Sequence, residues 1–247
     1  MRIATWNVNG IRAREAQLAE WLAAVQPDLA LLQELKARPD QVPALLAAPA
    51  DYWACWHGGG PYSGVALLVR RSLSAGPPAF FHPPFDFENR IVAAEVDGAT
   101  VASVYVPNGG KDYAAKLRFL EALAGWGAEL QAAGRPLLLG GDLNVARTDL
   151  DVFEKERDPE AIGQRPDERA LLERLLGTGL ADLHRGLHPG EAGLFTWWPP
   201  WRNMKQRNLG WRIDYLLAAS PYRATACQAA REFGTSDHAP LVAEITR

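Results

Sequence analysis

The chain has 247 residues, of which 48% are hydrophobic and 22% charged, so it is long enough to bury a substantial core beneath a polar surface. Its formal net charge of −3 gives no general attraction to a polyanion, so any contact with nucleic acid must come from locally clustered cations. No apolar run reaches the roughly 18 residues of a membrane span, and no cationic, apolar leader precedes the first strand, which argues against membrane-embedded and secreted proteins.

The cysteine content and the absence of linkers indicate the compartment and the domain organisation. Cys55 and Cys227 lie far apart and lack the paired spacing of a zinc site or a disulfide framework, so we expect two buried thiols in a cytoplasmic protein. The sequence has no internal repeat and no low-complexity linker, and its Pro- and Gly-rich stretches are short enough for loops. We therefore expect one domain over residues 1–247.

Short apolar segments alternate with helical patterns from the first residues onward. Apolar runs predict strands over residues 2–6, 29–33, 64–69, 91–96, 101–105, 137–141, 213–218 and 241–245. Apolar residues at helical spacing, such as Leu18, Trp21, Leu22 and Val25, predict helices over residues 11–25, 114–133 and 167–176. Because some strands are joined by helices and others by short turns, the pattern favours mixed β-sheets with helices packed outside them.

Polar side chains stand at the ends of five of these strands. They are Asn7 after the first strand, Glu34 after the second, Asp142 and Asn144 after the run 137–141, Asp214 at the start of a strand, and Asp237 with His238 before the last one. Asp142 and Asn144 are two residues apart and point to the same side if the chain stays extended. Each residue alone has a structural alternative as a turn former, helix cap or packing residue, but their convergence on strand ends favours one polar cluster.

A cluster of four carboxylates, two amides and one imidazole requires a cation. Like charges at close range cannot all remain ionised unless something neutralises them. Hard oxygen donors with few soft ligands favour Mg²⁺ or Mn²⁺ over zinc, and Mg²⁺ keeps coordination positions free for water and phosphate. The cluster therefore predicts phosphoryl-transfer chemistry that depends on Mg²⁺, with Mn²⁺ as a substitute.

Six segments in chain order together resemble the exonuclease III / AP endonuclease family. They are residues 6–12 (Trp-Asn-Val-Asn-Gly-Ile-Arg), 32–36 (Leu-Gln-Glu-Leu-Lys), 105–109 (Tyr-Val-Pro-Asn-Gly), 141–145 (Gly-Asp-Leu-Asn-Val), 210–215 (Gly-Trp-Arg-Ile-Asp-Tyr) and 236–240 (Ser-Asp-His-Ala-Pro). The resemblance covers essentially the whole chain. It implies a four-layer α/β sandwich of the DNase I-like type, with two mixed β-sheets flanked by helices.

The same resemblance implies a role for each polar residue at the strand ends. Glu34 would be the principal metal ligand, with Asn7 and Asp237 beside it around one or two ion positions, and Asp142 and Asn144 close enough to share in the ligation. Asp142 would orient or deprotonate the attacking water while Asn144 holds that geometry.

The proton donor and the phosphate contact are implied in the same way. His238, held by Asp214, would donate to the phosphate oxygen on which charge develops, and Tyr105 would contact the same phosphate. Hydrolysis of a phosphodiester needs an in-line water, charge neutralisation and help for the leaving oxygen, and these groups supply all three.

A basic, tryptophan-rich stretch over residues 197–212 could attract nucleic acid locally although the net charge of the whole chain is negative. It holds four cations, four Trp and no acid, so its cations can neutralise phosphates while its flat rings stack on or enclose a sugar. We expect Trp198 to be core, whereas Trp197, Trp211 and Ile213 match family positions that wall the pocket for an extrahelical abasic sugar. The candidate DNA contacts within the stretch are Arg202, Asn203, Lys205 and Asn208.

Further DNA contacts are expected from loops outside this stretch. Arg12, Lys36, Lys111 and Lys116 are candidate phosphate contacts, each with the alternative of an ordinary solvated charge. The loop over residues 58–64 resembles a family loop near DNA, and its glycines permit close backbone approach. The segment 151–166 is shorter than in many relatives and mixed in charge, which leaves the balance of activities open.

The preferred function is DNA repair by a monomeric nuclease that cleaves duplex DNA 5′ to abasic sites. The resemblance also implies removal of blocked 3′ ends and 3′→5′ exonuclease action. The alternatives are a phospholipid or inositol-phosphate phosphoesterase, a secreted nonspecific nuclease, and a DNA-binding protein with an inactive site. The basic Trp-rich stretch argues against the phosphoesterase, and the missing leader and disulfides argue against the secreted nuclease. The complete set of polar residues argues against an inactive site.

Overall fold

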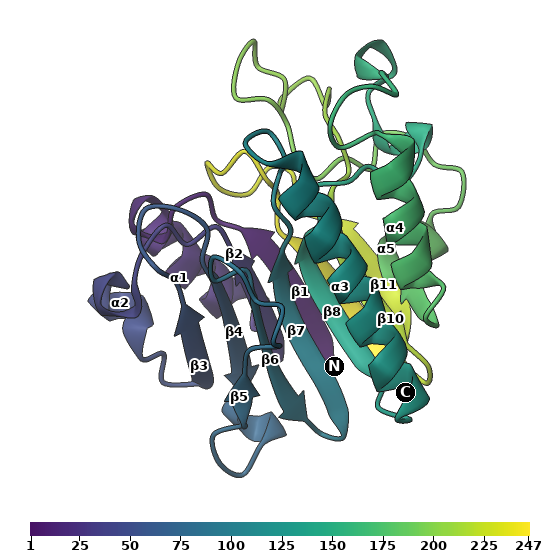
Figure 1. Cartoon of the computed structure of the whole chain (residues 1–247). Helices are drawn as coiled ribbons and strands as arrows, with labels where there is room; N and C mark the ends of the chain where they lie inside the picture. Colours follow the sequence, from purple (N-terminus) through teal and green to yellow (C-terminus); the bar gives the residue numbers. More distant parts are fainter.

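Two six-stranded sheets make up the centre of the computed structural model, which describes residues 1–247 (Figure 1). The first sheet has the order β11-β12-β1-β2-β4-β3. Its strands are β1 (Arg2–Asn7), β2 (Leu29–Gln33), β3 (Tyr52–His57), β4 (Val65–Arg70), β11 (Arg223–Ala229) and β12 (Leu241–Thr246). Because β1 and β2 run parallel while their other neighbours run antiparallel, the sheet is mixed, as predicted.

The second sheet has the order β5-β6-β7-β8-β10-β9 and is also mixed. Its strands are β5 (Phe80–Phe81), β6 (Ile91–Val96), β7 (Ala99–Tyr105), β8 (Leu137–Asp142), β9 (Leu180–Asp182) and β10 (Asp214–Ala219). Only β7 and β8 pair in parallel. A Cβ atom at Gly141 would lie 1.8 Å from the Val104 carbonyl oxygen, so only glycine permits β7 to approach β8 just before Asp142.

Helices cover the outer face of each sheet. The α-helices are α1 (Glu15–Val25), α2 (Ala44–Ala47), α3 (Tyr113–Ala132), α4 (Pro166–Leu176) and α5 (Leu183–Leu187), and short 3₁₀ turns are η1 (Ile11–Arg14), η2 (Pro39–Gln41), η3 (Arg71–Leu73), η4 (Asp149–Asp151) and η5 (Glu154–Glu156). Figure 1 shows α3 lying along the second sheet with α4 beside it. None of the helices combines the length and apolar character needed to cross a bilayer.

Three separate hydrophobic cores define four layers. The side chains of Ile3, Leu31 and Leu138 belong to the core between the two sheets. Leu139, one residue after Leu138, points the other way and packs with Phe119 from α3. A third core joins α1 to the outer face of the first sheet. This alternation along each strand produces the α/β/β/α sandwich, and the predicted fold class is confirmed.

Several edge elements were not predicted from the sequence. The strands β3, β5, β9 and β11 and the short helices α2 and α5 lacked a strong pattern, because edge strands are half exposed and short helices show too few turns for periodicity. The predicted first helix begins as the 3₁₀ turn η1 and becomes α-helical only at Glu15. Cys227 is buried as expected, but Cys55 is only partly buried, so the prediction of two buried thiols is right for Cys227 alone.

The strand register brings the polar strand ends to one end of the sandwich. Asp142 at the end of β8 is the register partner of Tyr105 on β7 and of Asp214 on β10. The chain termini lie at the opposite end, where the amino group of Met1 donates to the Ile245 carbonyl (Figure 1). The loops that follow β1, β2, β7 and β8 therefore surround a common site.

Candidate active site

Asp142 lies at the centre of the polar cluster. Its Oδ2 atom accepts a hydrogen bond of 2.9 Å from Asn7 Nδ2, which crosses from one sheet to the other. Its Oδ1 atom accepts from the backbone amide of Asn144 at 2.9 Å, and the Asn144 side chain in turn donates to the Val106 carbonyl. His238 Nε2 lies 3.8 Å from Asp142 Oδ2. Residues from both sheets thus fix one buried carboxylate.

His238 is held by Asp214, as the resemblance implied. Nδ1 of His238 lies 2.9 Å from Asp214 Oδ2, which leaves Nε2 directed toward Asp142. Burial opposes the charged imidazole, but the carboxylates of Asp214 and Asp142 outweigh it and raise the pKa of His238 to about 10. His238 is therefore a cation at neutral pH and can donate a proton from Nε2.

The segment that carries His238 is tied to β1. Ser236 Oγ donates to the Asn7 carbonyl at 2.8 Å and accepts from the His238 amide at 3.2 Å. The backbone amides of Ile213 and Asp214 both donate to Thr196 Oγ1 at 3.1 Å. These hydrogen bonds orient Asp214, the partner of His238. Ser236 and Thr196 were not predicted as site residues, because a hydroxyl that bonds only to backbone leaves no distinctive sequence pattern.

The charge balance of the cluster calls for a further cation. Burial, reinforced by the nearby Asp214 and only partly opposed by His238, raises the pKa of Asp142 to about 7. The Oδ1 atom of Asp214 is buried and lacks a hydrogen-bond partner. Ligand atoms of Asp142, Asp214 and His238 lie within 4.8 Å of one another, so two carboxylates lie close to the single positive charge of His238. The negative charge of the carboxylates at this site therefore exceeds the positive charge that His238 supplies.

Glu34 reaches the same site from an unusual backbone conformation. Its φ angle is +57°, in the left-handed region, and the left-handed residues Asn9, Lys36 and Asn144 follow the strands around it. Such conformations cost about 1–3 kcal/mol each and concentrate at functional sites. The Glu34 carboxylate pairs with Lys36 Nζ at 2.9 Å. The strained turn thus directs the Glu34 carboxylate into the cavity, next to the Lys36 ammonium.

A chain of contacts joins Glu34 to Asp237. Lys36 Nζ donates to Asn9 Oδ1 at 2.6 Å, and Asn9 Nδ2 donates to Asp237 Oδ1 at 2.7 Å. Burial opposes ionisation of Asp237, but His238 and the hydrogen bonds from Asn9 and Trp197 outweigh it and lower the pKa of Asp237. Asn9 was not predicted, although it lies two residues from Asn7. Carboxylate and amide oxygens of this kind fit a hard divalent cation such as Mg²⁺.

A cavity of about 410 Å³ opens directly above these groups. It is lined by the predicted residues Glu34, Tyr105, Asp142, Asn144, Trp197, Trp211, Ile213, Asp237 and His238, together with Asn108, Gly110, Ile162 and Gly163. Burial, helped by the charges of Glu34 and Asp142, raises the pKa of the Tyr105 phenol, which stays a neutral hydrogen-bond donor. Four of the five predicted catalytic residues therefore line one cavity, and the fifth, Asp214, lies behind it in contact with His238.

Two tryptophans wall this cavity and are fixed by acids. The rings of Trp197 and Trp211 meet edge to face, with centroids 5.7 Å apart. Trp197 Nε1 donates to Asp237 at 3.1 Å, and Trp211 Nε1 donates to Glu156 Oε2 at 2.7 Å. A Cβ atom at Gly163 would lie 2.7 Å from the Trp211 ring, so glycine is needed at this wall. Glu156, in the short loop 151–166, was not predicted as a site residue.

A groove continues from this cavity along the surface. It has a volume of about 730 Å³ and shares Glu34, Tyr105 and Asn108 with the cavity. The glycine-rich loop predicted to lie near DNA forms part of its wall, as do Lys36 and the exposed Lys111. The cavity and the groove therefore form one continuous depression in the surface.

The remaining DNA-contact candidates occupy different environments. Arg12, Arg202 and Asn203 are exposed. Lys205 donates to the Ser236 carbonyl at 2.9 Å and lies over the ring of Trp198, which is fully buried as expected. Both polar atoms of the Asn208 side chain bond within the protein, to Trp198 Nε1 and the Gly193 carbonyl.

Lys116 is not a phosphate contact, and this prediction is wrong. Its side chain is completely buried, pairs with Glu168, and donates to the Asn144 carbonyl at 2.7 Å. Burial lowers its pKa, although the Glu168 charge opposes that effect. Lys116 thus stabilises the backbone of Asn144 from within the core.

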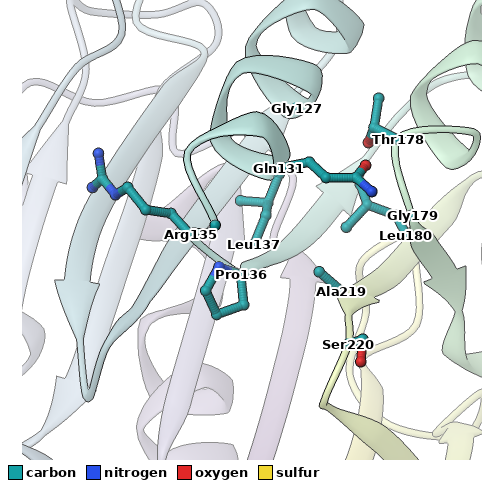
Figure 2. Close-up of a pocket in the computed structure, with 11 residues that line it drawn as sticks. Gly127, Gln131, Arg135, Pro136, Leu137, Thr178, Gly179, Leu180, Ala219 and Ser220 are labelled. Carbon is teal, nitrogen blue, oxygen red and sulfur yellow. The ribbon is translucent and has the colours of Figure 1, made fainter.

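A smaller cavity at the other end of the second sheet lacks this chemistry. It has a volume of about 230 Å³ and lies between the end of α3, the start of β8 and the turn after β10 (Figure 2). Gln131, Arg135, Thr178 and Ser220 supply its polar side chains, and no carboxylate or imidazole lines it. The catalytic site is therefore at the Asp142 end of the strands.

Comparison with known proteins identifies the family to which the chain belongs. The model of the endonuclease/exonuclease/phosphatase family matches residues 4–238. The DNA repair nuclease APEX1 of Danio rerio is 31% identical, over 98% of this chain and 81% of its own length, and an exodeoxyribonuclease of Bacillus subtilis is 30% identical, over 98% of each chain.

Solved structures agree with the sequence relatives. The 3′ phosphatase NExo from Neisseria, solved with a product DNA hairpin, is 32% identical and superposes with a TM-score of 0.89 over 100% of both chains. An AP endonuclease from Archaeoglobus fulgidus is 29% identical, with a TM-score of 0.84 over 100% of both chains. The chain is therefore a member of the endonuclease/exonuclease/phosphatase family, within its exonuclease III / AP endonuclease branch.

Proposed function

We propose that the protein is a Mg²⁺-dependent DNA-repair nuclease that hydrolyses the phosphodiester bond 5′ to abasic sites in duplex DNA. The same site would remove blocked 3′ ends and act as a 3′→5′ exonuclease, because each reaction breaks a phosphodiester or phosphomonoester bond with the same nucleophile. The observation that carries this proposal is the position of Asp142, bonded to Asn7 and facing His238 beneath a tryptophan-walled cavity.

Oxygen donors on the Glu34 side of the cavity would hold the ion. Glu34 is the principal ligand in this proposal, with Asn7 and Asp237 beside it and with Asp142 and Asn144 within reach of a second position. The chemistry that a bound Mg²⁺ supplies is neutralisation of the non-bridging phosphate oxygens, and Mn²⁺ has the same ligand preference. The Lys36 ammonium pairs with Glu34 Oε1. Lys36 would therefore have to move away from this oxygen before Glu34 could bind the ion through it.

Three side chains would carry the proton transfers and the charge. Asp142 is the buried carboxylate placed to accept a proton from the attacking water, and the Asn144 amide holds its orientation. His238 is cationic and donates to the phosphate oxygen on which negative charge develops. The neutral phenol of Tyr105 donates to the same phosphate.

The cavity walls would select for damage. Trp197, Trp211 and Ile213 form an apolar wall of the cavity that would favour a sugar without its base over one that carries a base. Extrusion of a nucleotide costs least where base pairing is already lost. Selection therefore needs no hydrogen bonds to a base. The short loop 151–166 takes part through Glu156, which holds Trp211.

The groove and the basic stretch would hold the DNA on either side of the cavity. Lys36 and Lys111 line the groove, and Arg12, Arg202 and Asn203 are exposed, so all five side chains are available to DNA in this proposal. Lys205 and Asn208 are engaged within the protein, so their role would be to shape the Trp-rich stretch. We propose that the chain acts as a monomer, as one catalytic domain over residues 1–247, in the cytoplasm.

The test is incubation of the purified protein with Mg²⁺ and a duplex that carries one abasic analogue. We expect a nick 5′ to the analogue that is abolished by chelator and reduced at least about 100-fold by Asp142→Asn, while DNA binding persists. Parallel reactions with phospholipid and inositol-phosphate substrates separate the phosphoesterase alternative. Binding without nicking in the wild type would identify an inactive DNA-binding protein, and nicking by Asp142→Asn at the wild-type rate would refute the mechanism.

A further inference from the structure

Three metal-ligating side chains gather outside the active site. They are His57 at the end of β3, His82 just after β5 and Asp86 in the loop before β6, and their ligand atoms lie within 4.8 Å of one another. His57 Nε2 lies 2.7 Å from Asp86 Oδ2, and the rings of His57 and His82 stack with centroids 3.7 Å apart. We propose that His57, His82 and Asp86 form a second metal site, specific for a first-row divalent transition metal such as Zn²⁺.

Neighbouring backbone groups orient two of the three ligands. Nδ1 of His82 lies 3.1 Å from the Ile91 carbonyl, which can only accept, so Nδ1 carries the proton and Nε2 keeps its lone pair. Oδ1 of Asp86 accepts from the amides of Arg90 and Ile91 at 2.8 and 3.1 Å, which leaves Oδ2 facing His57. Metal-binding histidines and carboxylates are commonly fixed by such outer hydrogen bonds.

The spacing of the donors suits one small ion. Bonds of about 2.0–2.2 Å to imidazole nitrogen and carboxylate oxygen place two ligands of one ion roughly 3 Å apart. The 2.7 Å separation of His57 Nε2 and Asp86 Oδ2 is close to that value, and the ion would replace the proton between them. The two rings are only 19° from parallel, so binding includes a tilt of the exposed His82 ring toward the ion.

The donor set distinguishes this site from the active site. Two imidazoles and one carboxylate favour Zn²⁺, Co²⁺, Ni²⁺ or Cu²⁺, whereas Mg²⁺ prefers oxygen ligands. The cluster is partly exposed, which gives an ion access and leaves coordination positions for water.

An ion at this site would join two walls of the DNA groove. His57 directly precedes the glycine-rich loop, and Asp86 directly precedes the segment 87–90, which lines an adjoining part of the groove. The two walls already touch, because Ser63 Oγ donates to the Glu88 carbonyl. The Arg90 guanidinium also lies 4.9 Å from the centre of the Tyr105 ring. The ion would therefore stiffen the groove without entering the hydrolytic step.

Cobalt(II) titration of the untagged, full-length protein in excess Mg²⁺ tests the site directly. We expect one equivalent of Co²⁺ to bind, with visible absorption bands that Zn²⁺ removes by displacement. His82→Gln and Asp86→Asn should weaken binding by at least about ten-fold. His188→Gln, which alters a histidine elsewhere on the surface, and Glu34→Gln, which alters the active site, should leave it unchanged.

Hydrogen exchange supplies a second readout that does not depend on the spectrum. Zn²⁺ should slow amide exchange in residues 58–64 and 86–90 of the wild type and have no such effect on His82→Gln. His82 is exposed, so this variant is expected to keep the wild-type Tm without metal. Absence of Co²⁺ binding, or binding that survives His82→Gln and disappears in Glu34→Gln, would overturn the proposal.

Discussion

His238 Nδ1 and Asp214 Oδ2 lie 2.9 Å apart, and the two residues reach that contact from the loop before β12 and from the first residue of β10. The two strands belong to different sheets, so the pair joins the halves of the sandwich at the catalytic end. Burial strengthens the attraction between the two side chains, and the carboxylates of Asp214 and Asp142 keep the imidazole charged although burial alone would favour its neutral form. The pair sets both the tautomer and the charge of the proton donor.

Replacement of Asp214 by Asn should lower activity and move its alkaline limit. In the wild type, the pKa of His238 is about 10, so the donor form is present at neutral pH and is lost as pH rises through that value. Without the Asp214 charge this pKa falls, and the loss begins at lower pH. We expect kcat/KM at neutral pH to fall about 100-fold or more. The pH profile of abasic-site incision measures both effects, and an unshifted alkaline limb would contradict the assignment.

Replacement of Asp142 by Asn should stabilise the metal-free protein while it removes activity. The folded pKa of Asp142, about 7, lies above the ordinary value of 3.8, so the folded state binds the proton more tightly and loses stability as pH rises between these values. An amide at this position avoids that loss. We expect a gain on the order of 1 kcal/mol at pH 8 in chelator, or about 2–4 °C in Tm.

Asp151→Asn is the matched control, and we expect it to lower the stability of the folded protein, whereas Asp142→Asn raises it. Asp151 is also a buried aspartate, but it pairs with Arg212 at 2.7 Å and with Arg185 at 2.6 Å. Burial opposes its ionisation, but both guanidinium groups outweigh burial and lower its pKa. Loss of the charge removes the acidic partner of Arg185 and leaves the buried Arg212 with Asp182 alone. We expect a loss of about 3 kcal/mol. Denaturant unfolding of both variants at pH 8 checks the contrast, and a shared direction would contradict the electrostatic argument.

Glu156→Ala should weaken damage recognition more than catalysis. The substitution removes the 2.7 Å hydrogen bond that fixes the indole of Trp211, so the pocket wall becomes mobile. Loss of one hydrogen bond of about 1 kcal/mol corresponds to a roughly five-fold loss of kcat/KM on abasic duplex, mainly through KM. Glu154→Ala, in the same turn but exposed, is the control. Equal effects of the two substitutions would exclude Glu156 from recognition.

Lys111→Ala should change the salt dependence of DNA binding. Lys111 is exposed and lines the groove, so its removal should reduce the slope of log Kd against log salt by about one, independently of DNA sequence. Arg135→Ala removes a cation at the opposite end of the molecule, beside the smaller cavity in Figure 2, and should leave the slope unchanged. Binding isotherms at several salt concentrations provide the measurement. An unchanged slope in Lys111→Ala would remove this residue from the interface.

The sequence predicted the central elements and the polar cluster because each followed from one local rule. Buried strands are apolar, so Asp142 and Glu34 stood out where the apolar runs end. The edge strands β3 and β11 were missed because half-exposed residues blur the alternation. The four layers followed from family resemblance, since periodicity does not reveal which faces of two sheets meet.

Residues that act through distant partners were the least predictable. Lys116 has the sequence context of a surface helix residue, and only its buried partner Glu168, on another helix, shows that it belongs to the core. The link from Lys36 through Asn9 to Asp237 likewise joins three separate loops. Such contacts depend on tertiary packing, and no local pattern in the sequence encodes them.

The most direct test is anomalous diffraction from a crystal of the protein grown with Mn²⁺ and a short abasic duplex. The account predicts a manganese peak beside the Glu34 carboxylate, in the cavity that also holds Asp142 and His238, and loss of that peak in Glu34→Gln. A peak on another face of the molecule, with this cavity free of metal while the DNA phosphate occupies it, would contradict the account.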